Sequence, residues 1–272
     1  MKPKIGIIGA GNMGGAIFRA LAAMPKFSEN VFLADLDAQK LEKIGAELSQ
    51  NLNADFSGNF FVDANEMARN CDFLILAIKP QSLEKFAENF RGEFSSKILI
   101  SILAGTKIAK LRAKLNFQKI ARAMPNLPAQ ISAGVCGVFC AKEISPREQK
   151  MICEILESFS KIVECETESD IDKITALSGS GPAYFFYLTA LLQNAAIKMG
   201  FEKKLAAKIA RQTFVGAAEI FKIENFSADE FVAKVASRGG TTEAALNFWR
   251  ENNFAEIFDG GIAAAKKRAT EL

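Results

Sequence analysis

The sequence predicts an α/β protein in which a doubly wound, mostly parallel sheet is followed by an all-α domain. In the first half, short β-rich apolar runs alternate with helical patterns; beyond about residue 166 only helical spacing remains. The 272 residues are 49% apolar and 24% charged, which suits one or two globular domains and excludes a disordered chain. We expect a sheet domain at 1–165 and a helical domain at 166–272.

The expected strands are mostly apolar at consecutive positions. Strands buried on both faces have this pattern, and it indicates a parallel sheet covered by helices. The predicted strands are Ile5–Ile8, Val31–Ala34, Phe60–Val62, Phe73–Ile78, Ile98–Leu103 and Ile120–Ala123, with Gly134–Cys140 and Lys161–Cys165 completing the sheet.

Helices are expected between these strands and throughout the second half. In the first half they start near Met13, Leu83, Ile108 and Pro146, and in the second half they cover Ala183–Met199, Lys204–Phe221, Ala228–Ala236, Thr242–Glu251 and Ala255–Ala269. The helix from Ala183 is apolar on every side, more than one small domain can cover. We therefore predict that it is buried against a second subunit, in a homodimer.

Composition excludes several function classes. The chain has no histidine, so imidazole acid/base chemistry is impossible. Its 34 basic and 31 acidic residues give a net charge of +3, and the scattered basic residues argue against nucleic-acid binding. The five cysteines form no CxxC pair, which favours reduced thiols, no metal and a cytoplasmic location. The charge-free stretch 174–197 is interrupted by glycine, proline and amides, so we expect no membrane span.

A glycine-rich turn follows the first strand and opens the first helix. Strand, GxGxxG, helix and a second strand ending in Asp35 together form the fingerprint of a Rossmann-type dinucleotide site. Its glycines permit a tight turn, pyrophosphate approach and helix–strand packing, while the helix N-terminus supplies N–H groups. The predicted contacts are Gly9, Ala10, Gly11, Asn12, Met13 and Gly14.

Asp35 bears on the choice of coenzyme. A carboxylate there can accept hydrogen bonds from the ribose hydroxyls and would repel a 2′-phosphate, which favours NADH over NADPH. The alternative is that Asp35 or Asp37 only caps the next helix. Two further strand-to-helix junctions lie where open sheets bind ligands, namely Ala77, Ile78, Lys79 and Pro80, and Ile102, Leu103 and Ala104. Lys79 can face the coenzyme or simply be a solvated loop charge.

Two glycine-rich segments in the helical half each open a helix. They are Leu177–Tyr184 (LSGSGPAY) and Ser237–Thr242 (SRGGTT). Clusters of N–H groups and hydroxyls at a helix N-terminus suit a small carboxylate, although a helix cap without any ligand has the same residues.

Taken together, the chain resembles the pyrroline-5-carboxylate reductases. The motifs that carry this resemblance run nearly from end to end in matching order: IGAGNMG (8–14), AIKP (77–80), SILAG (101–105), RAMPNLP (122–128), SGSGPAY (178–184) and GGTT (239–242). The resemblance implies hydride transfer from NADPH or NADH to the cyclic imine 1-pyrroline-5-carboxylate, giving L-proline. It also implies a dinucleotide-binding domain at 1–165 and an α-helical substrate-binding and dimerisation domain at 166–272 that interlocks with a partner. Active sites would form between the domains, in dimers that can assemble into a higher oligomer.

The resemblance also implies roles for residues of the second half. In that family the glycine–threonine loop holds the substrate carboxylate. Here we expect the N–H groups of Gly240 and Thr241 to bind it together with Ser237, and we count Gly239 and Ser178 as further substrate contacts. Thr242 lies near the ring nitrogen, as the catalytic residue. The chain departs from the family pattern at Arg238, where proline is usual, at Leu127, where threonine is common, and at Asp35, where many members carry small, polar or basic residues.

Two other functions fit parts of the sequence. A β-hydroxyacid dehydrogenase or related imine reductase has a similar two-domain plan, but these enzymes commonly place a catalytic lysine in the first long helix of the helical domain, and 183–197 contains none. A non-catalytic dinucleotide sensor would use the glycine–threonine loop only as a cap or dimer contact.

Overall fold

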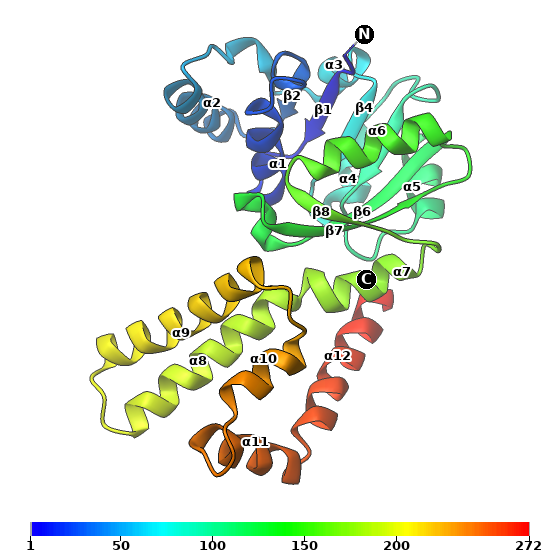
Figure 1. Ribbon diagram of the computed structural model, residues 1–272. Helices are drawn as coiled ribbons and strands as arrows, with labels where there is room; N and C mark the ends of the chain where they lie inside the picture. Colours follow the sequence, from blue (N-terminus) through cyan, green and yellow to red (C-terminus); the bar gives the residue numbers. More distant parts are fainter. Residues whose placement is uncertain (1, 272) are drawn as a thin grey trace. The chain divides into compact units, whose positions relative to one another are not determined.

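The computed structural model describes residues 2–271 and divides them into two compact units. Unit 1 comprises residues 2–180 and 265–271, and unit 2 comprises residues 181–264. The first contains the sheet and the second is entirely helical (Figure 1). The predicted fold class is confirmed.

Unit 1 is built on an eight-stranded sheet with the order β3-β2-β1-β4-β5-β6-β7-β8. All neighbouring strands are parallel except β6 and β7. The chain reverses direction across the sheet between β1 and β4, which creates a ligand-binding crevice at the carboxyl ends of the strands. The strands are β1 Ile5–Ile8, β2 Val31–Ala34, β3 Phe60–Phe61, β4 Phe73–Leu76, β5 Ile98–Ser101, β6 Lys119–Pro125, β7 Gly134–Cys140 and β8 Ser160–Glu164.

Helices cover both faces of this sheet, as the doubly wound prediction requires. One core cluster joins the sheet to α1, α2 and α6, and a second joins its other face to α3, α4 and α5 (Figure 1). The helices of unit 1 are α1 Asn12–Ala22, α2 Ala38–Leu52, α3 Ala64–Arg69, α4 Leu83–Asn89, α5 Ile108–Leu115, α6 Pro146–Glu157 and α7 Asp170–Ile174, which continues as a π-helical turn over Thr175–Gly179.

Four strands end earlier than the sequence predicted: β3 and β8 by one residue, and β4 and β5 by two. Strand β4 stops at Leu76, where Gly9 approaches the next residue so closely that a Cβ on Gly9 would lie 2.9 Å from the Ala77 carbonyl oxygen. Strand β5 stops at Ser101, although the Ile102 N–H still donates to the Leu76 carbonyl at 3.1 Å.

Unit 2 begins with α8 (Gly181–Lys198) and α9 (Lys203–Ile223), which pack against each other, and continues with α10 (Ala228–Val235), α11 (Thr241–Glu251) and α12 (Phe254–Glu271). The last turns of α12 group with unit 1. Many large apolar side chains of α8 are exposed in the single chain, with Phe185 at 56% and Tyr187 at 66% of their full area. Such a face needs a covering partner.

Within residues 2–271, none of the helices has the length and apolar character needed to cross a membrane. The same residues bring together no group of three acidic, cysteine or histidine side chains that could hold a metal ion. All five cysteines are free thiols, as predicted.

Candidate coenzyme and substrate sites

The glycine-rich turn joins β1 to α1 at the carboxyl edge of the sheet. Gly9 has φ +106°, which favours glycine, and a Cβ on Gly14 would overlap the Gly9 carbonyl oxygen. A Cβ on Gly11 would meet nothing within 4 Å, so open space borders the backbone there. The first N–H groups of α1 have no acceptor within the helix. These features fit a pyrophosphate group.

Asp35 is held against this turn from the end of β2. One carboxylate oxygen accepts a hydrogen bond from the Ala10 N–H at 2.7 Å and the other accepts from the Asp37 N–H at 2.9 Å. Asp37, not Asp35, is the N-cap of α2. Lys40 lies 3.9 Å from Asp35 and 3.4 Å from Asp37, so one ammonium faces two carboxylates. The Ala10 N–H is therefore engaged within the protein.

The other two junctions predicted for the coenzyme lie at the same edge of the sheet. Ala77, Ile78 and Pro80 are partly exposed, and Lys79 is exposed and joins none of the ion pairs found among residues 2–271. After β5, Ile102 and Ala104 are partly exposed, whereas the Leu103 side chain is 3% exposed and packs in the core. Leu103 can contribute only its backbone.

Ser178 lies in unit 1, on the π-helical turn that follows α7. Its hydroxyl oxygen accepts a hydrogen bond at 3.1 Å from the side-chain nitrogen of Asn126, which follows β6. Ser178 thus lies at the edge of the sheet, whereas the other predicted substrate residues belong to unit 2.

The glycine–threonine loop precedes α11 in unit 2. Gly239 has φ +73°, and its N–H donates to the Glu243 carboxylate at 2.7 Å. The Gly240 N–H donates to the Ser237 carbonyl at 3.0 Å. The N–H groups of Thr241 and Thr242, in the first turn of α11, have no acceptor within the helix. These two donors, rather than that of Gly240, are available to an anion.

A buried ion-pair cluster is centred on Arg122, in β6. The Arg122 side chain is 1% exposed and lies 3.3 Å from both Glu168 and Asp172. Glu168 also accepts a hydrogen bond at 2.7 Å from the Ile108 N–H, at the start of α5. The cluster therefore joins β6 to α7 and to the helix that follows the Ile102–Ala104 junction.

The cysteines are not candidates for nucleophilic chemistry. Burial raises the pKa of the Cys71 thiol to about 12, and burial with the nearby Cys153 and Glu164 raises that of Cys140 to about 12. Burial also raises the pKa of Cys136. Thiols with raised pKa values hold almost no thiolate at neutral pH.

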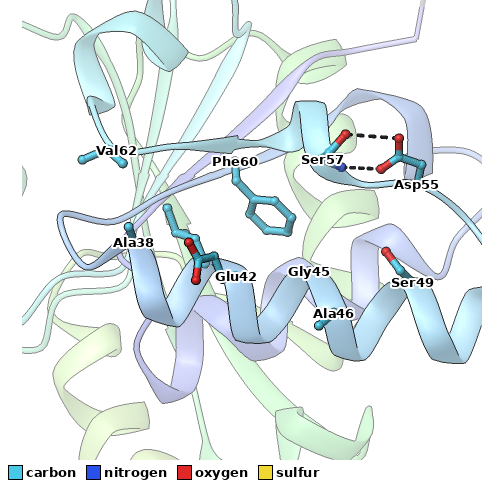
Figure 2. Close-up of a pocket in the computed structure, with 10 residues that line it drawn as sticks. Ala38, Glu42, Gly45, Ala46, Ser49, Asp55, Ser57, Phe60 and Val62 are labelled. Carbon is cyan, nitrogen blue, oxygen red and sulfur yellow. Dashed lines mark hydrogen bonds between the residues drawn. The ribbon is translucent and has the colours of Figure 1, made fainter.

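A groove lies between α2 and β3 (Figure 2). It has a volume of about 430 Å³, and none of the predicted site residues lines it. The Phe60 ring projects toward α2, where a Cβ on Gly45 would lie 2.8 Å from it. We attribute this groove to the packing of a short edge strand.

Comparison with known proteins decides the family. Residues 168–272 match the family model described as pyrroline-5-carboxylate reductase dimerisation, and residues 4–105 match that of the coenzyme F420-dependent NADP oxidoreductases. The pyrroline-5-carboxylate reductase of Pseudomonas aeruginosa is 30% identical over 99% of this chain and 97% of its own length. The chain belongs to the pyrroline-5-carboxylate reductase family. Methanosarcina acetivorans has a similar reductase, 32% identical over 99% of this chain and 97% of its own.

Solved structures agree with this assignment. The pyrroline-5-carboxylate reductase of Coxiella burnetii has a TM-score of 0.85 and 29% identity, covering 100% of this chain and 98% of its own. The Plasmodium falciparum enzyme, solved with NADP bound, has a TM-score of 0.80 and 28% identity, with the same coverage. The family predicted from the motifs, and with it an oxidoreductase function, is confirmed.

Sequence reasoning placed Arg122 and Asn126 in the RAMPNLP motif but gave neither residue a role of its own. Arg122 carries a signal in retrospect, because a single arginine interrupts an apolar strand between Ala121 and Ala123. Asn126 is a polar residue directly after a buried strand, at the edge where ligands bind. Ser178 was predicted as a substrate contact from its own motif, but its pairing with the distant Asn126 was not.

Proposed function

We propose that this protein reduces 1-pyrroline-5-carboxylate to L-proline with a reduced nicotinamide dinucleotide. The observation that carries the proposal is the family similarity over 99% of the chain. The glycine-rich turn before α1 in unit 1 and the glycine–threonine loop before α11 in unit 2 support it. Residues 1–165 would bind the coenzyme, and residues 166–272 would bind the substrate and the second subunit.

The crevice of unit 1 would hold the coenzyme. Open space beside Gly11 and the N–H groups that start α1 favour the pyrophosphate, and Asp35 can accept hydrogen bonds from a ribose. The junctions 77–80 and 102–104 would line the rest of the site. When bound, the reduced nicotinamide supplies the hydride.

The loop of unit 2 would hold the substrate. We assign its carboxylate to the N–H groups of Thr241 and Thr242, with Ser237, Gly239 and Gly240 shaping the loop. The Thr242 hydroxyl would orient or donate to the ring nitrogen. A protonated imine brings its own proton, so a chain without histidine can perform this reduction. Holding the reacting groups in attack geometry can supply about 7–11 kcal/mol of the barrier.

We propose NADH as the preferred coenzyme. Asp35 is fixed by two backbone N–H groups, and Asp37 adds a second carboxylate, while Lys40 is the single cation beside them. A 2′-phosphate placed there would meet net negative charge.

The working form would be a homodimer in which a second subunit covers the exposed apolar face of α8 and α9. Reduced thiols suit a cytoplasmic enzyme.

An absorbance assay of coenzyme oxidation with pyrroline-5-carboxylate tests the activity. NADH and NADPH are compared in parallel, with Asp35→Asn beside the wild type. We expect a higher kcat/KM with NADH and a shift of about tenfold toward NADPH in the variant, because one like charge is removed. A tenfold preference of the wild type for NADPH would refute the coenzyme proposal. No turnover with either coenzyme would refute the proposed reductase activity and favour a non-catalytic dinucleotide sensor.

A further inference from the structure

The Asn126 side chain extends the antiparallel ladder between β6 and β7 by one step. Backbone pairing ends with Pro125 opposite Cys136. The next N–H along β7, that of Val135, donates to the side-chain oxygen of Asn126 at 2.9 Å. Within the amide, only the oxygen can accept this hydrogen bond. The bond therefore fixes the amide with its oxygen toward Val135 and its nitrogen toward Ser178.

This orientation of the amide decides whether the Ser178 hydroxyl donates to Asn126 or accepts from it. The Asn126 nitrogen lies 3.1 Å from the Ser178 oxygen, and an amide nitrogen can only donate. The hydroxyl oxygen therefore accepts, and its hydrogen must point elsewhere. Among residues 2–271, that hydrogen finds no acceptor. Asn126 is 9% exposed and Ser178 is partly exposed. The pair therefore has a buried amide and a hydroxyl O–H that is free to donate to a bound ligand.

Close packing holds the turn that carries Ser178. The Ser180 N–H donates to the Thr175 carbonyl at 2.9 Å, which gives the π-helical geometry. A Cβ on Gly179 would lie 2.8 Å from the Met124 side chain, and one on Gly137 would lie 2.9 Å from Ile174. Since the turn approaches β6 and β7 this closely, the hydroxyl has little freedom to move away from Asn126. Local π-helical geometry of this kind is frequent at functional sites.

We propose that Asn126 is a positioning residue that fixes Ser178 as a hydrogen-bond donor to a carboxylate oxygen of the substrate. This inference rests on the proposed function. The pair lies outside the segment 4–105, which matches the oxidoreductase model, and Ser178 lies within the segment matched by the reductase dimerisation model. A donor aimed at an anion is worth more than one aimed at a neutral group.

Asn126→Asp tests this polarity with almost no change of shape. The aspartate still accepts from the Val135 N–H, but its second oxygen must accept from Ser178. The Ser178 O–H then donates to the aspartate and is no longer available to the substrate. At about pH 8 we expect KM for pyrroline-5-carboxylate to rise about ten- to a hundredfold with kcat little changed. At a pH low enough to protonate the aspartate, its O–H can again donate to Ser178, and the defect should shrink.

A double-mutant cycle separates this relay from direct repulsion by the new charge. If Asn126 acts through Ser178, then Ser178→Ala removes most of the effect, and Asn126→Asp adds little on that background. Additive losses in KM would overturn the relay. Calorimetric binding of L-proline should weaken in parallel with KM, whereas a change confined to coenzyme affinity would overturn the assignment to the substrate.

The matched control is Asn59→Asp. The Asn59 side chain donates to the Val31 carbonyl at 2.7 Å in unit 1, far from the predicted site residues in sequence. This variant should lower the melting temperature without changing KM. A wild type without turnover would refute the proposed function, whereas an active wild type with an unaltered Asn126→Asp variant would refute only the relay.

Discussion

Replacing Arg122 by methionine should destabilise the protein far more than the loss of an ordinary ion pair. The Arg122 side chain is 1% exposed and faces Glu168 and Asp172, whose side chains are 30% and 7% exposed. Without the guanidinium, Asp172 becomes a buried charge with no cation. Glu168 reaches solvent and keeps its bond from the Ile108 N–H, so it contributes less. Breaking a buried pair in this way costs about 3–5 kcal/mol.

The matched control lies on the same strand. Lys119 pairs with Glu148 at 2.6 Å, with side chains 32% and 24% exposed, and Lys119→Met should cost less than about 1 kcal/mol. Urea unfolding followed by circular dichroism, at one protomer concentration, measures both losses. Adding Asp172→Leu to Arg122→Met should recover part of the stability, because the unpaired charge is then gone. Equal losses for Arg122→Met and Lys119→Met would refute the reasoning.

Three further predictions concern activity and thiol chemistry. Thr242→Ala should lower kcat/KM about ten- to a thousandfold while the melting temperature stays unchanged. The control Thr213→Ala, inside α9, should leave kcat/KM unchanged. Wild-type kcat/KM in Thr242→Ala would remove this hydroxyl from the mechanism. Glu243→Gln removes a negative charge beside the Gly239 N–H and should lower KM for the anionic substrate a few-fold in steady-state assays; a higher KM would contradict this. Because the pKa of Cys140 is raised from 9.0 to about 12, its thiolate fraction at about pH 8 is about a thousandfold smaller than that of an ordinary thiol. Iodoacetamide should therefore label Cys140 only after unfolding, and native labelling at the unfolded rate would contradict the burial.

The dinucleotide turn could be predicted from sequence because its geometry is local. Gly9, Gly11 and Gly14 lie within six residues at a fixed spacing, so the pattern is visible in the sequence even though Gly9 also approaches the distant Ala77. The strands were predictable for a similar reason, since consecutive apolar residues indicate burial on both faces. Their ends were less predictable, because β4 stops where Gly9, far earlier in the chain, approaches Ala77.

Polar residues whose roles depend on distant partners were the hardest to predict. Glu168 is an ordinary acidic residue in the sequence, yet in the structure it accepts from Ile108 and pairs with Arg122. Asn126 and Ser178 are separated by a strand, two helices and a further strand, and only the close approach of the π-helical turn brings them together. A buried polar group must find a partner, but sequence does not say which. The glycine motifs could therefore be recognised in the sequence, whereas the partners that hold Glu168, Asn126 and Ser178 in place could be identified only from the structure.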